Sequence, residues 1–174
     1  AWPEHATFYE TGVGVVPNSA VDLIWHALPS ADPALFARLS MAFALVLFSA
    51  SVMVLARVVH GAWTLWSAAA ALLTYNAAFF WGFQNFLFTV PFAILALALW
   101  LRVEERPVLL RVAVFVPICL ALYVMHFFAF AGFVVAVMGR ELQGLLEDPK
   151  GFWAGVMQRL PLAIAPLPAL AHLF

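Results

Sequence analysis

Residues 58–101 read VVHGAWTLWSAAAALLTYNAAFFWGFQNFLFTVPFAILALALWL and run for 44 positions without Asp, Glu, Lys or Arg. A helix that crosses the hydrocarbon of a bilayer needs about 20 mainly apolar residues. This stretch is too long for one crossing and long enough for two crossings joined by a tight turn. The turn is expected near Gly82, which relaxes the backbone among aromatic side chains. Two spans are therefore predicted, at residues 62–80 and 83–101.

A further span is predicted upstream of this stretch. Residues 39–56 carry no formal charge. Asp32 followed by Pro33 is typical of a helix start, because the carboxylate caps free amides and proline suits the first turn. The first span is therefore expected at residues 34–59.

Downstream, residues 112–139 form a second long uncharged segment, which contains His126. One long tilted helix is the simple interpretation and is the one we favour. A helix broken within residues 123–130 is the alternative, since membrane proteins tolerate such breaks where the freed backbone is buried in protein or faces water. Whether this segment crosses once or re-enters stays open at this point.

Composition places the whole chain in a membrane. Of its 174 residues, 66% are apolar and 10% are charged, and the mean hydropathy is +1.01. Soluble domains carry about 25% charged residues, and disordered chains are polar. The net charge of −1 argues against a nucleic-acid partner. The predicted class is an all-α polytopic membrane protein with about four spans and lipids as neighbours.

The two flanking segments are expected to lie outside the spans. Residues 1–33 contain a short amphipathic helix, with Trp25 on its apolar side, that we place on the outer membrane surface. Residues 140–174 read as an amphipathic segment followed by the start of a further apolar helix. Because both ends lack closing signals, we expect a processed product or a stretch of a longer protein.

The distribution of basic residues predicts the orientation. Residues 1–37 hold four acidic residues and no Lys or Arg, so the N-terminus is expected outside the cytoplasm. Arg102 and Arg106 then fall inside. A single crossing of residues 112–139 places the later basic residues outside, against the rule, and a re-entrant segment would keep them inside. Those residues are Arg140, Lys150 and Arg159.

His126 is the ionisable side chain placed deepest in a predicted span, and such groups are candidates for function. Its imidazole is a candidate contact for a substrate or a lipid headgroup. As an alternative it could ligate a haem or bacteriochlorophyll. The simplest interpretation is a neutral histidine bonded to a neighbouring helix. No other cofactor and no metal site is predicted.

Amide side chains bracket the predicted turn, namely Asn76, Gln84 and Asn85. Because amides both donate and accept, they are candidates to bind sugar hydroxyls or a lipid phosphate, or to hold the helices together. Asp22, four residues before His26, is the best-placed carboxylate for a catalytic base or a cation contact. A solvated surface acid is the alternative for Asp22.

Five stretches carry a resemblance to an uncharacterised family of bacterial polytopic membrane proteins, whose layout is similar to that of the GT-C glycosyltransferases. They are VPNSAVDL (16–23), LTYN (73–76), FWGFQNFLF (80–88), ALALWLR (96–102) and LYVMHFFAF (122–130). The resemblance implies the bacterial inner membrane and, if the protein is an enzyme, sugar transfer from polyprenyl-phosphate donors on the outer face. GT-C enzymes keep their key carboxylate in the first outer loop, which this chain would lack if it begins within that loop, so no catalytic residue is carried over.

Three functions remain open from the sequence. The first is a segment of a GT-C-like protein that acts on lipid-linked sugars or envelope glycans. The second is a non-catalytic accessory subunit that packs against other subunits of a photosynthetic or respiratory membrane complex. The third is a transporter fragment, against which the lack of an inverted repeat speaks.

Overall fold

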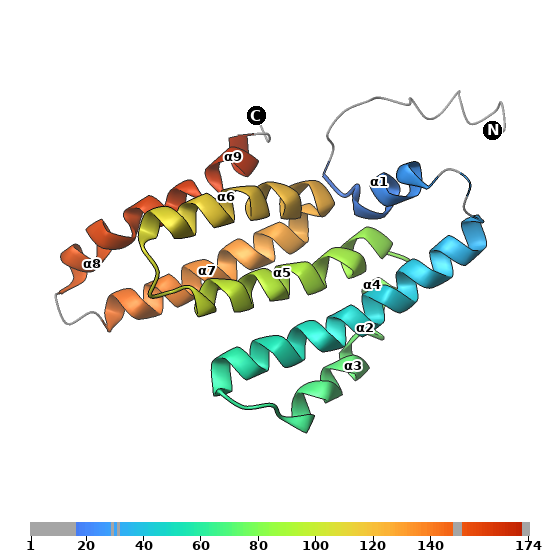
Figure 1. Ribbon diagram of the computed structural model, residues 1–174, viewed down its shortest axis with the longest axis horizontal. Helices are drawn as coiled ribbons and strands as arrows, with labels where there is room; N and C mark the ends of the chain where they lie inside the picture. Colours follow the sequence, from blue (N-terminus) through green and yellow to red (C-terminus); the bar gives the residue numbers. More distant parts are fainter. Residues whose placement is uncertain (1–16, 29, 31, 148–150, 172–174) are drawn as a thin grey trace.

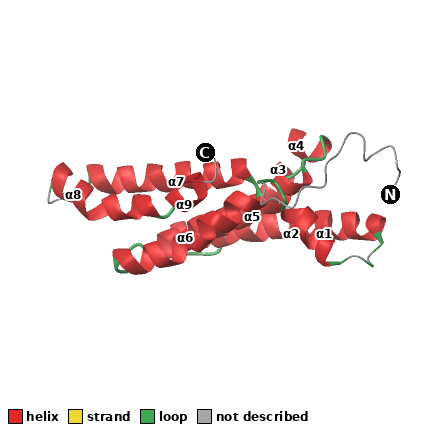
Figure 2. Ribbon diagram, turned by 90° about the horizontal axis from the view of Figure 1, so that it is seen from above, coloured by secondary structure: helices red, strands yellow, loops and turns green. Residues whose placement is uncertain are grey.

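The computed structural model describes residues 17–28, 30, 32–147 and 151–171, and the described residues form only helices and loops (Figures 1 and 2). Four helices are long and apolar enough to cross a membrane: α2 (Pro33–His60), α5 (Gln84–Arg102), α6 (Val108–Met125) and α7 (Phe127–Leu146). Their lengths of 18 to 28 residues correspond to about 27–42 Å at ~1.5 Å per residue. The predicted all-α polytopic class is confirmed, and these helices indicate an integral membrane protein.

Helix α2 occupies the segment expected for the first span, and local chemistry sets both of its ends. Asp32 caps it, because its Oδ1 accepts a hydrogen bond from Leu35 N at 2.7 Å. Pro33 occupies the first turn. Gly61 ends the helix with a φ of +73°, a left-handed conformation that glycine adopts without strain.

Residues 62–80 do not form the continuous span that the sequence predicts. They fold as a 3-10 helix η2 (Leu65–Ala69) and two single-turn helices, α3 (Ala70–Leu73) and α4 (Ala77–Phe80). The interruption lies at Asn76, whose extended backbone ends the helical path. Its Nδ2 donates to Leu73 O at 3.1 Å and its Oδ1 accepts from Phe79 N at 3.2 Å. The side chain thus replaces helical hydrogen bonds between backbone groups.

Residues 112–139 also differ from the single helix that we favoured. The chain turns at His126, whose φ of −167° and ψ of 121° are extended, so α6 ends and α7 begins there. His126 Nδ1 accepts a hydrogen bond from Phe128 N at 3.2 Å and thereby caps α7. The alternative of a break within residues 123–130 is the one observed, and α6 and α7 lie side by side (Figure 1).

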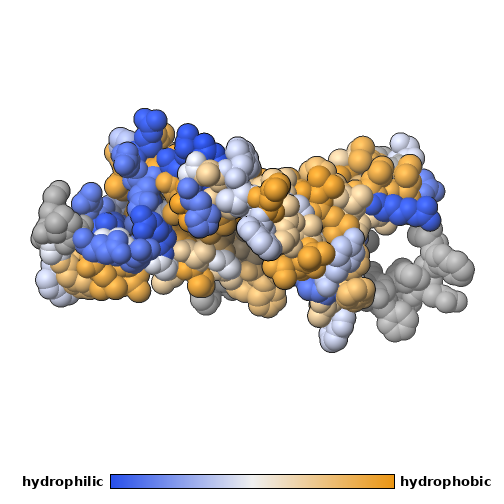
Figure 3. Space-filling view, turned by 90° about the horizontal axis from the view of Figure 1, so that it is seen from below, coloured by the Kyte–Doolittle hydropathy of each residue, from blue (hydrophilic) through white to orange (hydrophobic). Residues whose placement is uncertain are grey.

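The fold-back at His126 gives the bundle two chemically different ends. The α1 end holds helix α1 (Ala20–Ala27) and the starts of α5 and α7 (Figure 1). The opposite end, here called the arginine end, holds the loop between α5 and α6 and the end of α7. Hydrophilic residues gather mainly at the arginine end (Figure 3). The turn therefore brings Arg140 and Arg159 to the same end as Arg111 and removes the charge conflict of the single-crossing topology for these two residues, whereas Lys150 lies outside the described residues.

The core of the bundle lies between α5, α6 and α7. Trp100, Phe115 and Phe130 are at most 2% exposed, and Trp100 meets Phe115 with a ring-centroid distance of 4.6 Å. Large apolar side chains also cover the outside, for example Leu65 at 91% and Trp66 at 88% exposed. Such an apolar exterior suits a hydrocarbon surrounding.

The C-terminal segment runs back along the bundle in short helical pieces. These are α8 (Phe152–Arg159), η3 (Leu160–Ile164) and α9 (Leu167–Leu170). Helix α8 contacts α7, and η3 and α9 contact α6. The described part of residues 140–174 therefore contains the end of α7 and these pieces rather than one further apolar helix.

Candidate functional site

Asn85, in the first turn of α5, holds helix α1 against the bundle. Its Nδ2 donates to Asn18 O at 2.6 Å and to Asp22 Oδ2 at 3.0 Å. Its Oδ1 accepts from Val21 N at 2.7 Å. The structure thus brings together Asp22 and Asn85, which are 63 positions apart in the sequence.

The same region is tied to the turn between α6 and α7. Asn18 Oδ1 accepts from Phe127 N at 3.2 Å, and Ser19 N donates to Val124 O at 3.2 Å. Three chain segments therefore converge beside His126. The His126 ring packs edge-to-face on Phe86 with a centroid distance of 5.1 Å.

His126 is 8% exposed, and this burial lowers its pKa below the usual 6.5, so the ring is neutral at pH 7. Because Nδ1 accepts from a backbone amide, the ring proton resides on Nε2. Among the described residues, Nε2 has no hydrogen-bond partner. His126 thus offers one N–H donor from an otherwise aromatic surrounding.

A cavity of about 780 Å³ lies at this convergence, and we call it the amide–histidine cavity. Its volume is in the range of small-molecule sites. Gln84 Nε2 donates to Ser40 Oγ at 2.5 Å, while Gln84 Oε1 has no partner within the described part of the chain. An acceptor and a donor with spare capacity can bind hydroxyl groups. The lining residues are Asn18, Ala78, Gly82, Phe83, Gln84, Asn85, Phe86, His126 and Phe128.

Two other candidates do not line this cavity. Asn76 is exposed, and its side-chain amide hydrogen-bonds to backbone groups of the turn before α4. Asp22 is exposed and reaches the cavity only through its bond to Asn85. His26 Nδ1 contacts the backbone oxygen of Asp22 at 2.8 Å, so the two side chains do not form a carboxylate–imidazole pair. Within the described ranges, no group of three or more His, Cys, Asp and Glu is placed to hold a metal ion.

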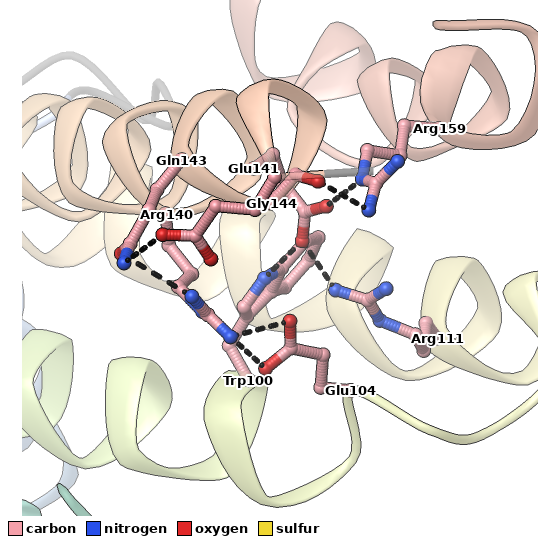
Figure 4. Close-up of polar contacts among 9 residues, drawn as sticks. Trp100, Glu104, Arg111, Arg140, Glu141, Gln143, Gly144 and Arg159 are labelled. Carbon is pink, nitrogen blue, oxygen red and sulfur yellow. Dashed lines mark hydrogen bonds and ion pairs between the residues drawn. The ribbon is translucent and has the colours of Figure 1, made fainter. Parts of the chain in front are cut away.

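A second polar centre lies at the arginine end and was not predicted (Figure 4). Glu141 Oε1 accepts from Trp100 Nε1 at 2.8 Å and from Arg111 Nη2 at 2.6 Å. Glu141 Oε2 lies 3.5 Å from Arg159 Nε. Beside it, Arg140 Nη2 contacts both carboxylate oxygens of Glu104, at 2.8 and 2.9 Å.

From the sequence no site was assigned to this centre, and Arg140 and Arg159 served only to predict the orientation of the chain. One signal was available, because Glu141 continues the helix directly after the apolar run that ends at residue 139. Glu141 lies one turn after the half-buried Val137 and two turns after the buried Phe133, and a carboxylate on that face of the helix needs a partner. Which arginines supply that partner depends on how α6, α7 and α8 pack.

Comparisons with protein-family models, with curated proteins and with solved structures found no match. A functional conclusion for this chain therefore rests on its own residues and their arrangement.

Proposed function

We propose that this chain is the membrane-embedded part of a protein that acts on lipid-linked sugars or envelope glycans, as its resemblance to the GT-C layout implies. In this proposal the amide–histidine cavity receives the polar part of the substrate. The observation that carries it is the cavity itself, where Gln84 Oε1 and His126 Nε2 make no hydrogen bond to any described residue.

The chemistry of the cavity fits a sugar. Hydroxyl groups donate to an amide oxygen and accept from an imidazole N–H. Phe83, Phe86 and Phe128 supply apolar walls, against which a ring or the first units of a polyprenyl chain can pack. A neutral His126 adds no charge that an uncharged sugar would have to balance.

The proposed orientation puts the α1 end outside the cytoplasm of a bacterial inner membrane. Asp22 and Asp32 lie at this end, and in the described part Arg38 is the one Lys or Arg beside them (Figure 1). The arginine end, which holds Arg111, Arg140 and Arg159, then faces the cytoplasm in accordance with the positive-inside rule. If the chain carries its own catalytic base, Asp22 is the candidate, held by Asn85 beside the cavity.

The test is binding of a polyprenyl-phosphate-linked hexose to the full chain in phosphatidylcholine nanodiscs. His126→Asn keeps a side-chain acceptor that caps α7 and removes Nε2. Gln84→Leu removes the amide. We expect each change to raise the Kd about fivefold, since a typical hydrogen bond contributes ~1 kcal/mol.

Ser40→Ala is the matched control, because it removes the bonding partner of Gln84 and does not line the cavity. It should leave the Kd within about twofold. Absence of binding to the unmodified chain, or an unchanged Kd in the His126→Asn/Gln84→Leu double variant, refutes the proposal.

A groove between α5 and α7 supports a second candidate, a non-catalytic subunit of a larger membrane complex. The groove encloses about 260 Å³ and is lined by Ala129, Gly132 and Ala136 among apolar residues. A Cβ added at Gly132 would meet nothing within 4 Å, so the described part of the chain leaves the space beside Gly132 unfilled. A partner helix can approach closely there.

For this candidate, Gly132→Leu should release the chain from a complex isolated in mild detergent, as measured by mass photometry. Isolation of the unmodified chain as a lone, stable species contradicts it.

In a version of this candidate that holds a cofactor, His126 would ligate a haem or bacteriochlorophyll. The complex isolated with His126→Asn would then lack the absorbance band of that cofactor.

A further inference from the structure

Asn18 lies just before α1 and connects it to two other parts of the bundle. Its backbone oxygen accepts from Asn85 Nδ2 at 2.6 Å, and its Oδ1 accepts from Phe127 N at 3.2 Å. Its φ of +78° lies in the left-handed region, which asparagine adopts more readily than most residues. Because Asn18 is bonded on two sides, its side chain has a defined place once the segment that carries it is docked.

The side chain of Asn18 adds a third polar group to the amide–histidine cavity, which it lines. Since Phe127 N is a donor, it requires the oxygen of the amide, and this leaves Nδ2 as the group with spare donors. Nδ2 makes no hydrogen bond to any described residue. With Gln84 Oε1 and His126 Nε2, the cavity then offers one acceptor and two donor groups to a ligand that carries several hydroxyls.

Helix α1 is held to the bundle by few buried side chains. Of its eight residues, Ala20 and Val21 are buried, and both lie in its first turn. The remaining contacts include the three hydrogen bonds of Asn85 and the packing of Trp25 on Phe36, with a ring-centroid distance of 5.1 Å. A short helix with few buried side chains opens at a lower free energy than the spanning helices beside it.

We infer that the segment comprising Asn18 and α1 is a movable wall of the amide–histidine cavity, and that Asn18 is a binding residue of that cavity. This inference rests on the proposed function, because it requires a sugar in the cavity. When the segment docks, Asn18 Nδ2 joins Gln84 and His126, and when it undocks, the cavity loses that donor. A ligand that accepts from Nδ2 therefore binds the docked form more tightly, and by linkage it holds α1 in place by the same factor.

The first measurement is hydrogen–deuterium exchange of the unmodified full chain in phosphatidylcholine nanodiscs, with and without a saturating polyprenyl-phosphate-linked hexose. The ligand should slow exchange of the amides of Ala20–Ala27 about fivefold, which is the effect of one hydrogen bond. Amides in the middle of α6 should keep their rate.

Val21→Asp should release α1, because Val21 is 7% exposed in a cluster with Ala44 and Phe88, where an unpaired charge is costly. Val21 does not line the cavity, so a rise of about fivefold in the Kd of the sugar lipid would report undocking. Leu23→Asp is the matched control, since it adds the same charge at a side chain of α1 that is 56% exposed. It should leave the Kd within about twofold.

Asn18→Asp tests the binding group itself and keeps the inference testable if Val21→Asp does not fold. The variant keeps Oδ1 for Phe127 N and suits a left-handed backbone, but its carboxylate has no donor. It should raise the Kd about fivefold, and the bound ligand should no longer slow exchange of α1. Without ligand, exchange of α1 should stay within about twofold of the unmodified chain.

Two results overturn the inference. One is a bound ligand that does not slow exchange of α1 in the unmodified chain. The other is an unchanged Kd in Asn18→Asp, or in Val21→Asp when exchange shows that α1 is released. An unmodified chain that binds no sugar lipid gives a different result, since it refutes the proposed function and this inference with it.

Discussion

Asn85→Ala should release helix α1 from the bundle and leave the spanning helices folded. Asn85 makes three hydrogen bonds to the segment that contains α1, at 2.6, 2.7 and 3.0 Å. Each bond contributes roughly 0.5–1.5 kcal/mol net, and water can replace part of the loss because two of the three are exposed. We therefore expect the free energy for local opening of α1 to fall by about 2 kcal/mol.

Hydrogen–deuterium exchange measures this effect directly. A loss of about 2 kcal/mol corresponds to roughly 30-fold faster exchange of the amides of Ala20–Ala27, because exchange from a locally opened state follows the opening free energy. Amides in the middle of α6 should exchange at their original rate.

Asn76→Ala is the matched control, because it removes an asparagine whose amide bonds only to the turn around α4. It should leave exchange in α1 unchanged. Exchange of α1 in Asn85→Ala that stays within about twofold of the unmodified chain would refute the role assigned to Asn85.

Three further outcomes are expected. Below about pH 6.5 the midpoint of thermal unfolding in detergent should fall, because burial lowers the pKa of His126 in the folded state. As the pH falls, the unfolded chain therefore binds the proton before the folded chain does. A midpoint that does not change with pH, or one that changes equally with pH in His126→Asn, would contradict this. Trp100→Phe should lower the free energy of unfolding by about 1–2 kcal/mol, as it removes a buried donor to Glu141, and an unchanged thermal midpoint would argue against that bond. Gly61→Ala should lower the free energy of unfolding by about 1 kcal/mol because Gly61 has a left-handed backbone conformation, and the added methyl meets nothing within 4 Å. Gly132→Ala is the comparison, since Gly132 lies within a helix, and it should not lower the thermal midpoint.

The sequence predicted correctly the helix start that residues next to it in the chain determine. The start of α2 followed from Asp32 and Pro33, and the structure shows that cap. By contrast, apolar length alone could not distinguish a continuous span at residues 62–80 from the short helices observed. The deciding interactions there are the two hydrogen bonds of Asn76 to its neighbouring backbone. A polar side chain in an apolar run fits either outcome.

The candidate site was predicted in part. Gln84 and Asn85 were singled out because amides both donate and accept hydrogen bonds, and His126 because an ionisable side chain within a predicted span is a candidate for function. All three line one cavity. The sequence did not indicate that the Asn85 side chain hydrogen-bonds to α1 or that His126 caps α7. Asn85 bonds to a distant segment of the chain, whereas His126 bonds to a backbone amide two residues away. Both interactions depend on which backbone groups lie nearby once the chain has folded.

Composition and the long uncharged runs by themselves determined that this chain is built of membrane-crossing helices. In hydrocarbon every backbone N–H and C=O needs a partner, and a helix of apolar residues supplies those partners within its own segment. The reversal at His126, and with it the meeting of Arg111 with Glu141 30 positions further along, was decided by the tertiary structure alone. Helical periodicity describes the faces of one helix. Which faces meet, and in which direction each helix runs, depends on packing between segments that are distant in the chain.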